Sequence, residues 1–285
     1  MNQRHAVVLS LAVAACGGSG GGPKIALRFH PPAGAVYHYA LEQRAQISIL
    51  SGPLTAMGKQ HFFLRMPFTQ RVKGPAREGG TEVEVVFESL TLEIPGVSPD
   101  RIARELAKVN GLRTTVVYDE RGQIVRSHFV PALDQSPDVA NQLEMGIKAT
   151  TLAFPDQPVG RGDSWTITSE LPPGQVPGGT SPAGAGRTTL TVREIRIAGS
   201  DTTVVLDIKT TFPSGPIPLA VGSQTGTVKL DGDLAGHQQF SISRGAILDG
   251  TIKGATKVHV AGGMLASKGM DLLTDSESSI FLLPD

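Results

Sequence analysis

Apolar and polar residues alternate with a period of two along most of the chain. In residues 81–85 the valines fall on one face and the carboxylates on the other, and Val204, Leu206 and Ile208 repeat the pattern further along. Because successive side chains of a strand point to opposite faces, such segments predict strands with one apolar and one polar face. An antiparallel sheet that packs on one side and meets water on the other has this pattern. We therefore expect a mainly β fold, with α+β as the alternative, in which antiparallel sheets form a curved half-barrel or a sandwich.

Two segments interrupt the alternation with helical patterns. Residues 98–100 and 136–138 both read Ser-Pro-Asp, which supplies an N-cap hydroxyl, a proline at the first helical position and an acid in the first turn. The first predicted helix lies near 99–109 and the second follows residue 137. Their apolar faces carry the candidate core-facing or apolar-ligand residues Ile102 and Leu106 in the first helix and Val139, Leu143 and Ile147 in the second. We expect these faces to cover the inner face of the sheet.

The N-terminus has the layout of a secretory signal. Arg4 precedes an apolar run over residues 6–15, and Cys16, the one cysteine of the chain, follows it. At 1.5 Å per residue such a run extends about 15 Å, which is too short to cross a hydrocarbon core of about 30 Å.

Residues 13–16, Val-Ala-Ala-Cys, resemble the bacterial lipobox. That resemblance implies a signal peptide over 1–15 and a lipidated Cys16 carrying a diacylglyceryl group and an acylated amine, such as palmitate. Gly17 stands where an aspartate would resemble an inner-membrane retention signal, so the resemblance favours the outer membrane, on the periplasmic or cell-surface side. The alternative is an ordinary cleaved signal beside an unrelated cysteine.

The remaining chain divides into a tether and two β units. The glycine-rich residues 16–23 predict a flexible tether of about 15 Å. We expect a first β unit over 24–131, a connecting helix and linker over 132–154, and a second β unit over 155–285. Arg121-Gly122 and Arg244-Gly245 recur 123 residues apart in similar hairpin turns, which suggests a duplication, although unrelated hairpins share such turns. The proline-rich residues 213–222 predict a loop.

Composition limits the function classes. The chain has 26 basic and 26 acidic residues without a basic cluster, so a nucleic acid is not an expected partner. A single cysteine cannot form an intramolecular disulfide. The histidines are scattered without metal-ligand spacing, and neither a nucleotide-binding motif nor a catalytic grouping is present, so we expect no metal, cofactor or catalytic residue.

The run from Phe154 to Trp165, with the later strands near 189–208 and 240–252, resembles an uncharacterised family of secreted β-rich bacterial lipoproteins. The resemblance brings no catalytic residue with it and implies a non-enzymatic protein. We expect a membrane-anchored envelope lipoprotein with a binding or structural role, whose partners are the membrane, through the N-terminal lipid, and another envelope protein or an apolar ligand. One alternative is a carrier of a lipid or other apolar ligand in a half-barrel cavity, and a second is a hydrolase.

Overall fold

The structure is a computed structural model that describes residues 24–107, 109–130, 147, 151–170, 185–212, 215–221, 224–262 and 266–284. Cys16 and the predicted signal and tether lie outside the described residues, as do Val139 and Leu143.

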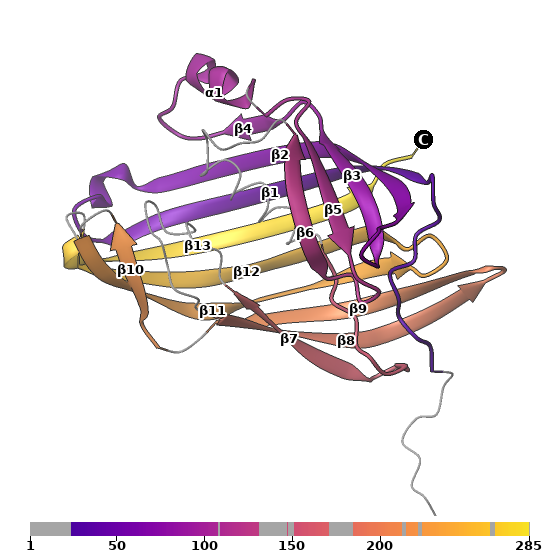
Figure 1. The fold of residues 1–285 in the computed structure, drawn as a ribbon. Coiled ribbons are helices and arrows are strands. Elements are labelled where there is room, and N and C mark those ends of the chain that lie inside the picture. Colours follow the sequence, from indigo (N-terminus) through magenta and orange to yellow (C-terminus); the bar gives the residue numbers. More distant parts are fainter. Residues whose placement is uncertain are drawn as a thin grey trace, which may run out of the picture.

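The described chain forms one antiparallel sheet of 13 strands, which confirms the mainly β prediction (Figure 1). The strands are β1 (Val36–Ser51), β2 (Lys59–Pro75), β3 (Thr81–Phe87), β4 (Thr91–Glu93), β5 (Arg113–Tyr118), β6 (Ile124–Val130), β7 (Ser164–Glu170), β8 (Ala185–Ala198), β9 (Asp201–Thr211), β10 (Ile217–Val221), β11 (Gln224–Ser241), β12 (Ala246–Gly262) and β13 (Ala266–Leu282). Their order is β6-β5-β3-β2-β1-β13-β12-β11-β9-β8-β7, with β4 paired to β2 and β10 to β11. The first and last strands therefore meet in the middle of the sheet.

The register gives the sheet an apolar inner face and a charged outer face. On the inner face Leu41 lies opposite Met66 on one side and Ile280 on the other. On the outer face Arg44 lies opposite Glu277, and Glu277 lies opposite Lys253, so opposite charges face one another across three strands. This is the alternation that the sequence predicts, carried across the sheet by the strand pairing.

In the part of the chain that the structure describes, the inner face is closed on itself at one end. Figure 1 shows the short strands β3, β5 and β6 lying across the long strands at the end where β1 begins. There Tyr118 of β5 and Phe240 of β11 belong to one buried cluster, together with Phe87 and Leu206. We call this the closed end. The open end is the opposite one, where β1 and β12 finish.

The helices differ from the prediction in length and place. Helix α1 covers Pro99–Leu106 and starts where the Ser-Pro-Asp signal predicts. A separate 3-10 turn covers Thr55–Met57, between β1 and β2. We predicted that α1 would cover the inner face, but it lies beside β4 (Figure 1). Strand β4 pairs only with β2, so the loop that carries α1 leaves the sheet at that point.

The proline-rich segment near 213–222 was predicted to be a loop, and this is wrong for Ile217–Val221, which forms β10. Pro218 lies opposite Thr227 of β11. Strand β10 pairs with β11 alone, and an edge strand tolerates proline because its outer side needs no ladder donor.

Candidate functional site

An aliphatic patch occupies the inner face at the open end. Ile49, Leu272, Val258 and Leu230 lie opposite one another across β1, β13, β12 and β11. The next positions along these strands extend it. The open-end patch consists of Ile47, Ile49, Val228, Leu230, Val258, Val260, Met270 and Leu272. Of these only Val228, at 2% exposure, is fully buried, and the others are half-buried.

The inner face between the patch and the closed end is lined by small or polar residues. Ala45 lies opposite Ser276, and Ser276 lies opposite Gly254. Gln43, one position further along the inner side of β1, is exposed although it lies on the same face as the buried Leu41. The inner face is therefore exposed to solvent at Gln43, whereas Thr256, between Gly254 and the patch, is buried.

The chemistry of the open-end patch favours a hydrocarbon occupant. Its eight residues are aliphatic or methionine, without a charge or an aromatic ring. Protein interfaces are enriched in aromatic residues and arginine at their centres, whereas such residues are absent from this patch. From Gln43 to Ile49 strand β1 rises about 20 Å, which suits a long acyl chain lying along the strands.

A larger hollow crosses the middle of the sheet. It has a volume of about 800 Å³ and is lined by β2, β1, β13 and β12 at His61–Phe63, Arg44–Gln46, 275–277 and 253–255. Its lining includes Ala45, Ser276 and Gly254 of the inner face, together with the outer-face residues on either side of each. Its charges are balanced, since Arg44 and Lys253 stand against Asp275 and Glu277. It therefore has no preference for the sign of a ligand.

The closed end holds a small enclosed space of about 40 Å³, among whose walls are Tyr39, Tyr118, Phe154 and Phe240. Such a space suits about one water molecule and not an organic ligand. Burial raises the pKa of Tyr39 and of Tyr118 above the ordinary tyrosine range. Among the described side chains no buried nitrogen or oxygen lacks a hydrogen-bond partner. The closed end is thus a packed core.

One polar group at the open end combines the residue types of a hydrolase. Ser51 donates a hydrogen bond of 2.6 Å to Asp271, and a ring nitrogen of His259 lies 2.7 Å from the same carboxylate. In a catalytic triad the histidine touches the nucleophile and the acid orients the histidine. Here the carboxylate stands in the middle, so the serine contacts the acid and not the base. The arrangement fastens the ends of β1, β12 and β13 to one another.

A second cluster of polar side chains, on the outer face, is also unsuited to catalysis. Thr69 lies 2.9 Å from a ring nitrogen of His38 and donates a hydrogen bond of 2.6 Å to Glu88. The Thr69 side chain is buried, at 3% exposure, so its hydroxyl cannot reach a substrate. The group holds β1, β2 and the turn after β3 together.

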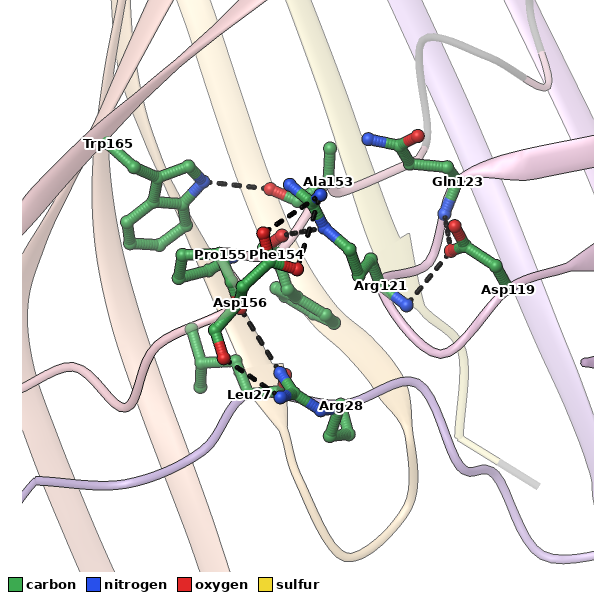
Figure 2. Close-up of polar contacts among 10 residues, drawn as sticks. All are labelled: Leu27, Arg28, Asp119, Arg121, Gln123, Ala153, Phe154, Pro155, Asp156 and Trp165. Atoms are coloured by element: carbon green, nitrogen blue, oxygen red, sulfur yellow. Dashed lines mark hydrogen bonds and ion pairs between the residues drawn. The ribbon is translucent and has the colours of Figure 1, made fainter.

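Two arginines, Arg28 and Arg121, fasten residues near the start of the described chain and the β5–β6 hairpin to the segment before β7 (Figure 2). The Arg28 guanidinium donates to the carbonyl oxygens of Pro155 and Asp156 at 3.1 and 3.0 Å. Arg121 donates to the carbonyl of Phe154 at 2.8 Å and lies 3.3 Å from the Asp156 carboxylate. Both guanidinium groups therefore donate hydrogen bonds to backbone carbonyl oxygens that do not take part in strand pairing.

The hairpin that carries Arg121 is itself braced. The Asp119 carboxylate accepts the backbone N–H groups of Arg121 and Gln123 at 2.9 and 2.8 Å, as in an Asx turn. The Trp165 indole N–H donates to Ala153 at 2.8 Å and holds the same segment to β7 (Figure 2). We call these contacts, with those of Arg28, the latch.

The structure places the sequence-predicted site residues apart. Ile102 and Leu106 are half-buried on α1 and line neither hollow. Ile147 is helical and belongs to the closed-end core at 4% exposure. Cys16, Val139 and Leu143 lie outside the described residues. The sequence analysis missed the open-end patch, because alternation marks an apolar face but not which part of that face is covered.

Within the described ranges no helix is long and apolar enough to cross a membrane. The same ranges contain no group of three or more His, Cys, Asp and Glu side chains that could hold a metal ion.

Comparison with known proteins gives a fold likeness alone. No family model and no curated protein matches the chain. A solved structure titled "Lipid-protein interactions in lipovitellin" aligns at 12% identity and a TM-score of 0.48 over 90% of this chain. The aligned part covers 25% of the lipovitellin chain, so this chain spans about a quarter of that length.

Proposed function

We propose that this protein binds the acyl chain of a lipid, or a similar apolar molecule, on the inner face of its curved sheet, and does so without chemical turnover. The supporting observation is the open-end patch, in which seven of the eight aliphatic side chains are only half-buried. A ligand that covered this surface would gain about 25 cal/mol for each Å² of apolar area removed from water. The solvent-exposed position at Gln43, on the same face, gives the chain of the ligand a way in.

We also propose that the protein is tethered to a membrane through a lipidated Cys16. The latch and the backbone pair between Ile25 and Val159 fix residues 25–28 at the closed end. A tether of residues 16–23 would reach about 15 Å from there. Under this proposal the closed end faces the bilayer and the open-end patch points away from it.

Ligand binding can be tested with a pair of neighbouring leucines on β13. Leu272 belongs to the inner face and Leu273 to the outer face, and both are half-buried. Protein without bound lipid is titrated with the fluorescent fatty acid cis-parinaric acid. We expect Leu272→Thr to weaken binding about five- to tenfold, because the leucine is already half-buried and covering the rest of it contributes about 1 kcal/mol, less than the roughly 1.5–3 kcal/mol of full burial. Leu273→Thr is the matched control and should leave binding unchanged.

Equal effects of the two substitutions, or no binding by the wild-type chain, would contradict the proposal. Native mass spectrometry of protein purified without detergent gives a second readout. A copurifying acyl species that is lost in Leu272→Thr supports the inner-face site.

The anchor is tested by expressing the full chain with Cys16→Ser in a bacterium that has the lipoprotein pathway. The wild-type chain should fractionate with membranes and the variant with the aqueous fraction, because stable attachment needs two or more acyl chains. Equal membrane association of both chains would exclude lipidation at Cys16 and leave the ligand-binding test unaffected.

A further inference from the structure

The two halves of the sheet are built in the same order. Strands β1-β2-β3-β5-β6 are consecutive neighbours in the first half, and β7-β8-β9-β11-β12 are consecutive neighbours in the second. Each half makes one excursion between its third and fourth strands, to β4 and α1 in the first and to β10 in the second.

The register shifts between paired strands also fall at corresponding positions in the two halves. A register shift follows Val72 on β2, and the corresponding shift follows Val192 on β8. A second shift lies between Val117 and Tyr118 on β5, and its counterpart lies between Gln239 and Phe240 on β11. Bulges mark particular positions of a strand pair, so two agreements of this kind are hard to obtain by chance.

The segments that precede the two halves make matching contacts. Gly34 and Gly162, with φ of 81° and 86°, each donate a backbone hydrogen bond of 2.8 Å, the first to Val72 and the second to Val192. Phe29 packs on Tyr118 with ring centroids 4.8 Å apart, and Phe154 packs on Phe240 at 4.7 Å. We infer that the halves are two copies of one five-stranded unit.

The two units differ in that only the second has β13 beside its last strand. In the second unit the last strand, β12, pairs with β13 along its outer edge, from Asp249 opposite Phe281 onward. The last strand of the first unit is β6, and in the described chain no strand pairs with its outer edge. This edge carries two of the most exposed large aliphatic residues, Val125 at 62% and Val130 at 51%.

We propose that the free edge of β6 accepts an extended segment of a partner protein, in the position that β13 has beside β12. The backbone of the edge strand supplies the hydrogen bonds, and the alternate side chains supply the selectivity. The binding is independent of the inner-face ligand and of the anchor.

The register defines the chemistry of the segment. Asp249 on β12 corresponds to Arg126 on β6, so the partner residues opposite Arg126–Val130 correspond to Phe281 back to Glu277. Ser127 and Phe129 share the inner face, and Arg126 and His128 the outer one. The segment should therefore alternate, with aliphatic or small residues facing inward, like Ile280 and Ser278, and acidic, hydroxyl or aromatic residues facing outward, like Glu277, Ser279 and Phe281.

The chain itself offers the probe. A labelled peptide with the β13 sequence of residues 272–282 is added to the full chain, and binding is followed by fluorescence anisotropy. Two further peptides carry N-methyl groups on alternate amides, one set at even and one at odd positions. A strand directs every second backbone N–H toward a given neighbour. One set of N-methyl groups should therefore abolish binding, and the other should leave binding unchanged.

Hydrogen exchange locates the peptide. We expect slower exchange over residues 124–130 in its presence, with no change over residues 246–262. Val125→Lys with Val130→Lys should weaken binding, since lysines protect exposed edges. Equal effects of the two N-methyl sets, slower exchange elsewhere, or a β6 already protected and unable to bind the peptide would each overturn the proposal.

Discussion

The closed and open ends of the sheet differ in what covers the same apolar face. At the closed end Phe240 and Leu206, at 2% and 0% exposure, belong to one buried cluster with residues of β3 and β5. At the open end Leu272 and Val258, on the same face of neighbouring strands, are half-buried. Both ends satisfy the alternating pattern equally well.

The difference follows from strand length. Strands β1, β2, β11, β12 and β13 have 16 to 18 residues, whereas β3, β5 and β6 have 6 or 7. Because the short strands cross one end of the long ones, the described sheet packs on itself at that end. The long strands carry the apolar face beyond this core, and the side chains there are mostly half-buried.

The largest effect should come from the core of the closed end. Phe240→Ala removes a ring that packs on Phe154 at 4.7 Å, and we expect a loss of about 3–5 kcal/mol in the free energy of unfolding. Leu272→Ala at the open end should cost about 1 kcal/mol, because its side chain is only half-buried. Urea unfolding of both variants measures the difference. Similar losses would mean that the two ends are equally part of the core.

Local patterns in the sequence were sufficient to predict strands and the start of α1, which the Ser-Pro-Asp signal before Asp100 marks. They failed at Ile217–Val221, where prolines suggested a loop and pairing to β11 decided otherwise. The pairing of β1 with β13 joins residues such as Leu41 and Ile280, which no local pattern relates.

The candidate ligand surface was harder to predict than the fold. Val258 and Val260 stand on either side of His259 in the same alternating pattern as Val204 and Leu206, yet only the lengths of other strands decide whether such a face is covered. The latch has no sequence signal either, because Arg28 binds backbone carbonyls of Pro155 and Asp156, which every residue type possesses.

A glycine at the closed end should give the next largest effect. Gly245 has a φ of 59°, and a Cβ there would lie 2.5 Å from the nitrogen of Pro31. Gly199 is the matched control, since its φ is 61° and a Cβ would meet no atom within 4 Å. We expect Gly199→Ala to cost about 1–2 kcal/mol from backbone strain alone and Gly245→Ala about 3 kcal/mol.

Thermal unfolding of the two glycine variants, together with limited proteolysis of residues 24–35, checks this prediction. Faster cleavage of that segment in Gly245→Ala alone would show that its packing holds the N-terminal residues in place. Equal stability of the two variants would mean that the segment before β1 adapts to the added methyl group, and the closed end would be less rigid than its burial indicates.

The smallest effect should be at the polar contact that fastens the open end. The Ser51 hydroxyl and, to a lesser extent, His259 lower the pKa of Asp271 below its ordinary value. A lowered pKa in the folded state means that the contact stabilises the fold above the ordinary aspartate pKa, and that this stabilisation is lost as the pH falls through the lowered value. Ser51→Ala should raise the Asp271 pKa part of the way back, because His259 remains 2.7 Å away. A carbon-13 NMR titration of the carboxylate measures the shift. An unchanged Asp271 pKa would mean that His259, and not Ser51, lowers it. In that case the Ser51 hydroxyl would not help to join β1 to β13 at this end, and only the backbone hydrogen bonds and the apolar contacts of the patch would do so.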